Sequence, residues 1–206
     1  MTADNTPQLI AIAISHYCEK ARWAMDYLGI DYVEEDHAPP FHQQYTSRHG
    51  GSSVPVLVTE DKAFTDSTDI LHYLDISTGR KLYPEDLELR ERIETLEKLF
   101  NEKLGVATRT WAYYYAIQQP FKVAIAWGLK APLIERARAI LSFPQIPQIL
   151  KQFYGINSAT KDAAMQDIKE VFTVVERKLA SGQKYLVGDC FTAADLTFAA
   201  LASPFL

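Results

Sequence analysis

The chain has little cysteine. Only Cys18 and Cys190 occur among its 206 residues. Two cysteines are too few for the disulfide framework of a small secreted protein, so their number favours a reducing compartment. The N-terminal stretch "MTADNTPQ" also lacks the basic residues and the apolar core of a signal peptide. We therefore expect a cytoplasmic protein.

Basic clusters and long apolar runs are absent as well. The net charge is -5 and no Lys/Arg cluster is visible, which argues against a nucleic-acid partner. The longest apolar stretch, over residues 196–206, is too short to span a bilayer, so we expect no membrane partner. The histidines, at positions 16, 37, 42, 49 and 72, lack the spacing of a closed metal site, so we expect no metal. A small soluble partner is the default that remains.

The first part of the chain mixes strand and helix patterns. In order, the patterns predict a strand over residues 9–14, a helix over 19–28 closed by Gly29, a strand in "DYVEED", a weak helix after Pro39-Pro40, strands in "SVPVLV" and "KAFT", and a helix from Ser67 to about Ile76. Strands and helices that alternate in this way are typical of a small α/β domain.

The rest of the chain reads as helical. Apolar residues recur at helical spacing through "DLELRERIETLEKLFNEKLGVATRTWAYYYAI", and further helical runs cover residues 132–151 and 161–179. "STGRKLYPED" has the composition of a linker. We therefore predict domains over residues 1–80 and 81–206, the second all-helical.

The final helix has a start signal in "GDCFTAADLTFAAL". Thr192 and Asp195 have the spacing of a capping box, and Phe191 and Leu196 that of a hydrophobic staple. The sequence stops at Leu206, about two turns into this helix, so we expect that some C-terminal structure is missing.

The stretch "AIAISHYCEKARWAMDYLGI" places Ser15 where a strand gives way to a helix. The unpaired N–H groups and the dipole of a helix N-terminus favour a thiolate there. A serine hydroxyl can donate a hydrogen bond to the sulfur of a bound thiol and hold it as a nucleophile. A serine before a helix is also simply a helix cap, and the stretch alone leaves both readings open.

Two further segments have features that suit a peptide-like ligand. Pro55 precedes a strand in "SSVPVL", where a cis Val54–Pro55 bond would expose the Val54 backbone for pairing with an extended ligand. Asp66 and Ser67 begin a helix in "FTDSTDILHYL", whose N–H groups suit a carboxylate. A turn proline and an ordinary N-cap are the plain alternatives.

In these motifs and their order, the chain resembles the cytosolic glutathione S-transferase family, of the serine/cysteine type found in bacteria. The motifs are "SHYCEKARWAMDYLGI", "SVPVL", "DSTDILHYL" and "GDCFTAADLTFAAL". The resemblance implies a thioredoxin-like N-terminal domain that binds glutathione as co-substrate, and an all-helical domain that shapes the pocket for a small hydrophobic electrophile. It also implies a homodimer and a role in detoxification.

The resemblance assigns roles to individual residues. Ser15 takes the position that contacts the glutathione sulfur. Val54 and Pro55 resemble the backbone clamp on the cysteinyl part, and Asp66 and Ser67 resemble the pair that holds the γ-glutamyl end. The candidates for the glycine carboxylate are His42, Gln43, Arg48 and His49. Here "HQQYTSRHGGSS" departs from the family's Asn-Pro-x-Gly pattern, and the sequence does not rank the candidates.

Other residues compete for these roles. Tyr17 is a rival thiol-activating hydroxyl, although pocket lining or packing suits its position better. Cys18 matches the second cysteine of the glutaredoxin motif, but it lacks the partner that dithiol exchange requires, so we expect it to pack on the helix face. Arg109 and Tyr113 are four residues apart on a helix and are expected to share a face in the acceptor pocket, unless they serve the core and the solvent.

The main prediction is therefore a glutathione transferase that conjugates the glutathione thiolate to small hydrophobic electrophiles. Two alternatives stay open. One is glutathione-dependent peroxide or disulfide reduction, which a depressed pKa at Cys18 would favour. The other is a non-catalytic binding or scaffold protein of the same fold.

Overall fold

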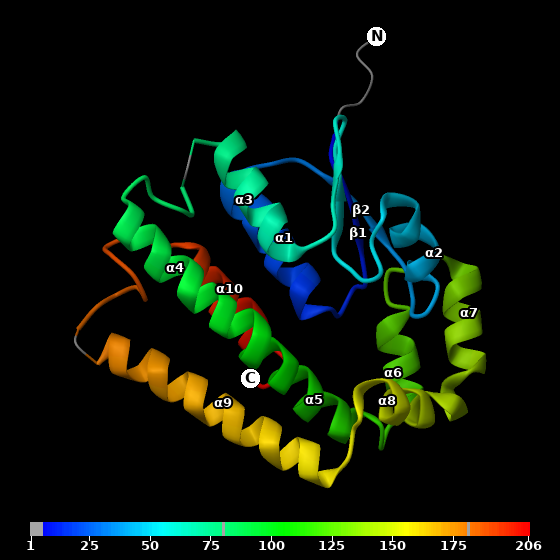
Figure 1. The fold of residues 1–206 in the computed structure, drawn as a ribbon. Helices are drawn as coiled ribbons and strands as arrows, with labels where there is room; N and C mark the ends of the chain where they lie inside the picture. The colour runs from blue at the N-terminus through cyan, green and yellow to red at the C-terminus, as the bar shows by residue number, and fades with distance from the viewer. Residues whose placement is uncertain (1–5, 80, 181) are drawn as a thin grey trace. The chain divides into compact units, whose positions relative to one another are not determined.

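The computed structural model describes residues 6–79, 81–180 and 182–206. The chain forms two compact units (Figure 1). One consists of the chain up to Leu74 together with Gln119–Pro147, and the other of Asp75–Gln118 together with Gln148–Leu206. The predicted domain boundary at residue 80 stays a prediction. None of the helices in the described ranges is long and apolar enough to cross a membrane.

A mixed four-stranded sheet forms the centre of the first unit. Its strands are β1 (Gln8–Ala11), β2 (Val33–Asp36), β3 (Val56–Val58) and β4 (Ala63–Phe64). Their order is β2-β1-β3-β4, with β1 parallel to β2 and the other two pairs antiparallel. The predicted α/β unit is confirmed. The first strand ends earlier than predicted, because the chain turns where the Ser15 amide donates to the Ile12 carbonyl over 3.0 Å.

Helix α1 (His16–Leu28) connects the two parallel strands. It starts three residues before the predicted helix, with Ser15 as its N-cap. It ends at Gly29, as predicted, where a left-handed φ of 69° suits a residue without a side chain. The weak helical stretch after Pro39-Pro40 forms α2 (His42–Thr46) and the short 3₁₀ turn η1 (Ser47–His49), and α3 spans Ser67–Ser77.

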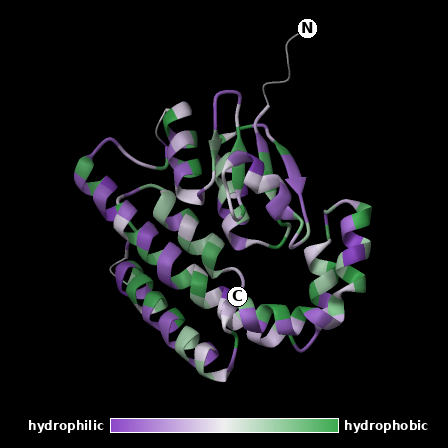
Figure 2. Cartoon of the chain, turned by 45° about the vertical axis from the view of Figure 1, so that its right-hand side comes forward, coloured by the Kyte–Doolittle hydropathy of each residue, from purple (hydrophilic) through white to green (hydrophobic). Residues whose placement is uncertain are grey.

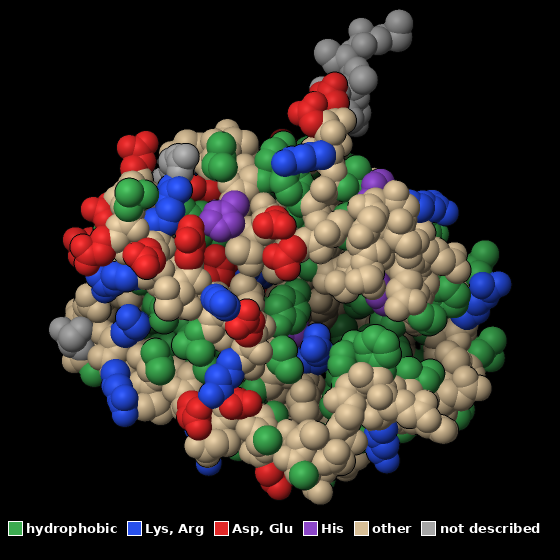
Figure 3. Space-filling view, in the orientation of Figure 1, with side chains coloured by type: hydrophobic (Ala, Val, Ile, Leu, Met, Phe, Trp, Pro, Cys, Tyr) green, Lys and Arg blue, Asp and Glu red, His purple; other side chains and the backbone are tan. Residues whose placement is uncertain are grey.

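The segment Gln119–Pro147 belongs to the first unit and adds a helical hairpin. It contains α6 (Pro120–Trp127), α7 (Leu133–Leu141) and the 3₁₀ turn η3 (Phe143–Gln145). The predicted helical run over residues 132–151 covers α7, whereas the sequence did not predict α6. Hydrophobic side chains reach the surface along α7, next to basic ones (Figure 3).

The second unit is entirely helical within the described ranges. It contains α4 (Leu87–Leu99), the π-helical turn η2 (Phe100–Leu104), α5 (Gly105–Ala116), most of α8 (Ile146–Tyr154), α9 (Ser158–Leu179) and α10 (Ala193–Ala202). These helices carry hydrophilic and hydrophobic bands along their length (Figure 2). The half-buried Phe198 ring lies 5.4 Å from the buried Phe100 ring and 5.3 Å from the Phe172 ring, measured between centroids. α10 is therefore central to this unit.

The predicted capping box at the start of α10 is confirmed. One carboxylate oxygen of Asp195 accepts from the Thr192 amide over 2.9 Å and from the Thr192 hydroxyl over 2.8 Å. The other oxygen accepts from the Leu186 amide over 2.8 Å. One side chain thus fixes both the first turn of α10 and the loop before it. The predicted staple between Phe191 and Leu196 stays a prediction.

We expect Asp195→Ala to destabilise the second unit. The substitution leaves the Leu186 and Thr192 amides without their acceptor, which costs about 2 kcal/mol in the free energy of unfolding. Urea titration followed by the far-ultraviolet helical signal measures the change. Asp189→Ala, which removes an exposed carboxylate from the same loop, is the control and should leave the midpoint unchanged. Equal midpoints for the two variants would contradict the prediction.

Candidate functional site

The N-terminus of α1 holds the residue that the sequence predicts as catalytic. The Ser15 Oγ accepts a hydrogen bond from the Cys18 amide over 3.3 Å, and the Ser15 carbonyl accepts the first helical bond from the Glu19 amide over 2.8 Å. Ser15 has extended backbone angles and is half-buried. A hydroxyl oxygen that accepts from an amide still carries a proton to donate. Ser15 can therefore cap α1 and donate to a bound anion.

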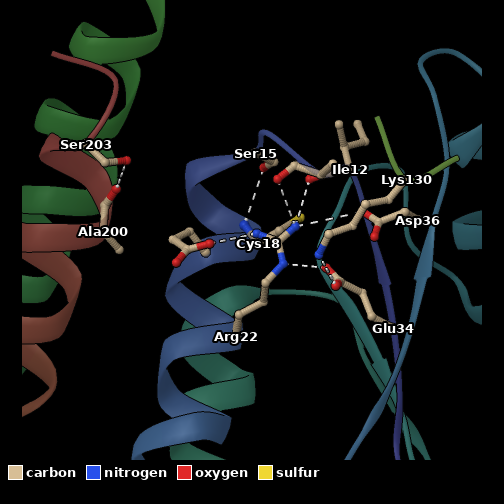
Figure 4. A network of polar contacts seen from close by, with 11 residues as sticks. Ile12, Ser15, Cys18, Arg22, Glu34, Asp36, Lys130, Ala200 and Ser203 are labelled. Atoms are coloured by element: carbon tan, nitrogen blue, oxygen red, sulfur yellow. Dashed lines mark hydrogen bonds and ion pairs between the residues drawn. The ribbon is translucent and has the colours of Figure 1, made fainter. Parts of the chain in front are cut away.

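Arg22 fixes the loop that leads to Ser15, and the sequence did not point to it. Its guanidinium donates to the carbonyls of Ile12 over 3.1 Å and Ala13 over 3.2 Å, and it also forms a hydrogen bond with Glu34 of β2 (Figure 4). Burial alone raises the pKa of Glu34, but hydrogen bonds from Lys130 and Arg22 outweigh it and hold the pKa below its usual value. The loop is thus tied to both α1 and the sheet.

Cys18 lies on the inner face of α1 and is fully buried. Burial raises the pKa of its thiol to about 11, although hydrogen bonds from Ser15 and the Ile12 backbone and the charge of Arg22 oppose this rise. The thiol is therefore protonated at neutral pH and shielded from solvent. These properties fit the predicted packing role and disfavour Cys18 as a redox centre.

The predicted peptide clamp lies before β3. The Val54–Pro55 peptide bond is cis, as predicted, and Pro55 is buried whereas Val54 is half-buried. In the part of the chain that the structure describes, Val54 forms no backbone hydrogen bond outside regular helices and strands. A residue without such bonds, next to a cis proline, is a candidate for backbone pairing with an extended ligand.

The start of α3 provides the second predicted contact region. The exposed Asp66 carboxylate accepts from the Thr68 amide over 2.7 Å, while Ser67 is buried at the first position of the helix. Lys20 of α1 is fully buried and donates to the Thr68 hydroxyl over 3.0 Å. This link between α1 and the start of α3 was not predicted, because a lysine between Glu19 and Ala21 reads as a solvent-facing residue.

The candidates for the glycine carboxylate differ in their surroundings. Burial, and next the charge of His37, lower the pKa of His42, which favours the neutral ring. The His42 Nδ1 is buried without a hydrogen-bond partner among the described residues. The Arg48 side chain is exposed, with its guanidinium carbon 5.0 Å from the centroid of the Tyr45 ring. A carboxylate would therefore find a positive charge at Arg48 and a neutral group at His42.

Arg109 and Tyr113 share a face of α5, as their spacing predicts. The Arg109 guanidinium carbon lies 4.8 Å from the centroid of the Tyr154 ring, and the Tyr113 and Tyr154 rings are 5.3 Å apart. The Nε of Arg109 is buried without a hydrogen-bond partner among the described residues. These three residues form one polar and aromatic cluster within the second unit.

Among the described residues, no three His, Cys, Asp or Glu side chains are placed to hold a metal ion. The features of the first unit that suit a ligand are a helix N-terminus with a hydroxyl, the Val54 backbone before a cis proline and a second helix start. They suit an extended, anionic ligand.

Models of known protein families match both parts of the chain. A model of the glutathione S-transferase N-terminal domain matches residues 9–81, and one of the C-terminal domain matches residues 138–203. Together the two matches cover more than half of the chain. The chain belongs to the glutathione S-transferase family. No curated relative matches it.

Solved structures of glutathione S-transferases and of a β-etherase have the same fold. The β-etherase LigF from Sphingobium sp. strain SYK-6 is 21% identical with a TM-score of 0.68, covering 96% of this chain and 83% of its own. Glutathione S-transferase-I bound with lactoylglutathione is 17% identical with a TM-score of 0.66, covering 97% and 83%. Glutathione transferase F7 from Populus trichocarpa is 15% identical with a TM-score of 0.66, with the same coverage.

Membership of the glutathione S-transferase family confirms the predicted architecture, a thioredoxin-like unit with a helical C-terminal domain, and glutathione as co-substrate. The solved structures share too little sequence identity with this chain to indicate more than its fold. The individual site residues, the serine/cysteine subtype and the acceptor substrate stay predictions for this glutathione S-transferase.

We expect the two cysteines of this glutathione S-transferase to differ sharply in reactivity. Cys18 is buried with a raised pKa, whereas Cys190 is exposed. Titration of the native protein with a chromogenic disulfide at neutral pH should show one fast thiol per chain. Cys190→Ser should abolish this fast phase, and Cys18→Ser should preserve it. A second fast thiol in the native protein would contradict the burial of Cys18.

Proposed function

We propose that this protein activates glutathione as the thiolate and transfers it to small hydrophobic electrophiles. The observation that carries the proposal is Ser15 at the N-terminus of α1, half-buried and held in place by its bond to the Cys18 amide. Membership of the glutathione S-transferase family, which the family models show, supports glutathione as the thiol substrate.

The physical basis of activation is stabilisation of a negative charge outside a helix. The amides of the first turn and the helix dipole favour an anion at this end of α1. A hydrogen bond from the Ser15 hydroxyl to the sulfur adds to this effect and orients the nucleophile. Both interactions stabilise the thiolate more than the thiol, so the pKa of bound glutathione falls and more of it reacts at neutral pH.

The remaining groups of the first unit account for glutathione binding. The Val54 backbone pairs with the cysteinyl part, beside Pro55. Ser67 and the first turn of α3 take the γ-glutamyl carboxylate, and the exposed Asp66 carboxylate lies one residue away for the ammonium group. For the glycine carboxylate we favour Arg48 over His42, because the environment of His42 keeps its ring neutral.

The acceptor pocket is assigned to Tyr17, Arg109 and Tyr113. The cluster of Arg109 with Tyr113 and Tyr154 supports this assignment, because it combines aromatic faces with a cation. Such a cluster suits an aromatic acceptor on which negative charge develops during attack. We further propose a cytoplasmic homodimer of the serine/cysteine subtype. The raised pKa of Cys18 weighs against the alternative of disulfide or peroxide reduction.

We expect Ser15→Ala to lower the rate of conjugation of glutathione to a chloronitrobenzene by about 100-fold, while glutathione still binds. The physical reason is the loss of the hydrogen bond to the thiolate. The apparent pKa of the pH–rate profile should move upward, because the bound thiol then ionises less readily. Stopped-flow or spectrophotometric rates and calorimetric binding measure the two effects.

Loss of the helix cap has to be separated from loss of thiol activation. Ser15→Thr keeps the hydroxyl and the cap and should retain the rate, whereas Ser158→Ala removes an exposed hydroxyl at the start of α9 as the control. A Ser15→Ala variant with wild-type rate and pH profile would leave Ser15 as a cap only. Glutathione binding without turnover in the wild type would favour the scaffold alternative.

We expect Ser67→Ala to weaken glutathione binding about tenfold by removing a hydrogen bond to a charged carboxylate. Calorimetry on the wild type and the variant tests this. Cysteinylglycine, which lacks the γ-glutamyl carboxylate, is the matched probe and should bind both proteins equally. An equal loss of affinity for glutathione and for cysteinylglycine would show that Ser67 does not act on the γ-glutamyl carboxylate.

A further inference from the structure

Helix α7 has the reverse of the usual arrangement of polar and apolar residues. Leu133 is 77% exposed, Ile134 69% and Leu141 81%, whereas Glu135 is buried. The helices of a water-soluble domain normally turn their apolar face to the core and their charged residues to solvent. An exposed row of large apolar side chains therefore indicates a surface that a partner covers.

The buried carboxylate explains why α7 has this rotation. One oxygen of Glu135 lies 2.9 Å from the His37 Nδ1, and the other accepts from the Ala38 amide over 2.9 Å. One turn later, Ala139 packs in a small cluster with Ala38 and Ala131, which Phe41 also contacts. Both inward-facing positions of α7 are thus occupied by contacts within the first unit, and the apolar residues face outward.

The outward-facing apolar residues lie on one arc of the helix, which we call the α7 apolar stripe: Leu133, Ile134, Ala137, Ile140 and Leu141. At 3.6 residues per turn, Arg136 falls beside one edge of this arc and Arg138 beside the other. Both arginines are exposed. Figure 3 shows the resulting mixture of hydrophobic and basic side chains at the right-hand edge, where α7 lies.

Helix α6 repeats this combination. Phe121 and Ile125 are exposed at a spacing of four residues, and the Phe121 ring lies 5.6 Å from the Phe143 ring of η3. Lys122 is exposed next to them. Lys130, which follows α6, is already paired with Glu34 over 2.8 Å. Within the described ranges, Lys122, Arg136 and Arg138 form no ion pair with a carboxylate.

The charge of this hairpin is opposite to that of the whole chain. Gln119–Pro147 contains four basic residues and a single acidic one, Glu135, in a chain with net charge -5. Glu135 faces inward, so no acidic side chain of the hairpin accompanies the exposed apolar residues. The surface is therefore apolar at its centre and cationic at its edges.

We propose that the α7 apolar stripe docks on the surface of an anionic lipid bilayer. Apolar side chains of an interfacial helix enter the boundary between headgroups and acyl chains, and basic residues on both sides reach the phosphates. A symmetric contact with a second copy would instead bring the arginines of both chains together, where they repel. The expectation of no membrane partner rested on the lack of a spanning segment, and docking on the surface requires none.

Co-sedimentation of the full chain with vesicles tests the proposal. The vesicles contain equal parts of phosphatidylcholine and phosphatidylserine, and vesicles of phosphatidylcholine alone are the comparison. We expect binding only to the anionic vesicles and a loss of binding at high salt. Leu133→Ser combined with Leu141→Ser should reduce the bound fraction about tenfold. Leu87→Ser, at a leucine of α4 that is 79% exposed, is the matched control and should not reduce it.

A charge variant tests the second part of the surface. Arg136→Glu should weaken binding to the anionic vesicles, whereas Arg177→Glu, at an exposed arginine of α9, should not. Circular dichroism checks that each variant is folded. No binding of the wild type to the anionic vesicles would overturn the proposal, as would equal binding of the α7 variants and their controls. The wild type could instead bind no vesicles and form a dimer in light scattering that the Leu133/Leu141 double variant does not form. That result would assign the α7 apolar stripe to contact with a second copy of the chain.

Discussion

The buried guanidinium of Arg22 is the interaction on which the rest of the first unit depends. It holds the carbonyls of Ile12 and Ala13 and forms an ion pair with Glu34. A charge that is buried without partners costs several kcal/mol, so these contacts are kept together or lost together. Ser15 directly follows this loop. Its position at the N-terminus of α1 is therefore a consequence of the hydrogen bonds and the ion pair that Arg22 forms.

The same polar network extends to the helical hairpin through β2. Glu34 also accepts from Lys130, and the residue that follows β2, His37, contacts Glu135. β2 is an edge strand of the sheet, and edge strands of soluble proteins are usually covered or charged. Here the Glu135 carboxylate anchors α7 beside the end of β2, together with the packing of Ala139 on Ala38. These two inward-facing residues fix the rotation of the helix without using its large hydrophobic residues, which is why those of α7 remain outside.

Local rules in the sequence were sufficient to predict the features that depend on neighbouring residues. Ser15, Gly29 and Thr192 are recognisable because helix ends select a few residue types. A cis Val54–Pro55 bond was one of two interpretations of a proline before a strand, beside an ordinary turn proline, and it is present. The order of strands and helices then indicated an α/β domain followed by a helical one, because alternation of periods in the sequence limits the possible architectures. The thioredoxin-like architecture itself came from the resemblance to glutathione S-transferases.

Contacts between distant polar residues were not predictable in this way. Glu135 and His37 are 98 positions apart, and neither belongs to a motif. Lys20 and Arg22 lie in a stretch where charged residues normally face solvent, and burial of both depends on partners that only the folded chain supplies. Helix α6 was missed for a related reason, because "PFKVAIAW" is apolar almost throughout and has no helical period to detect.

The division of labour between Ser15 and Cys18 follows from the balance of two physical effects. Cys18 lies in the first turn of α1, where the dipole lowers the pKa of a thiol, with an effect of about 1 kcal/mol. Its burial acts in the opposite direction and wins, since the pKa of Cys18 rises to about 11. A helix N-terminus therefore activates only a sulfur that stays outside the core. In the proposed function that sulfur comes from glutathione, and the half-buried Ser15 hydroxyl, which does not itself ionise, would hold it.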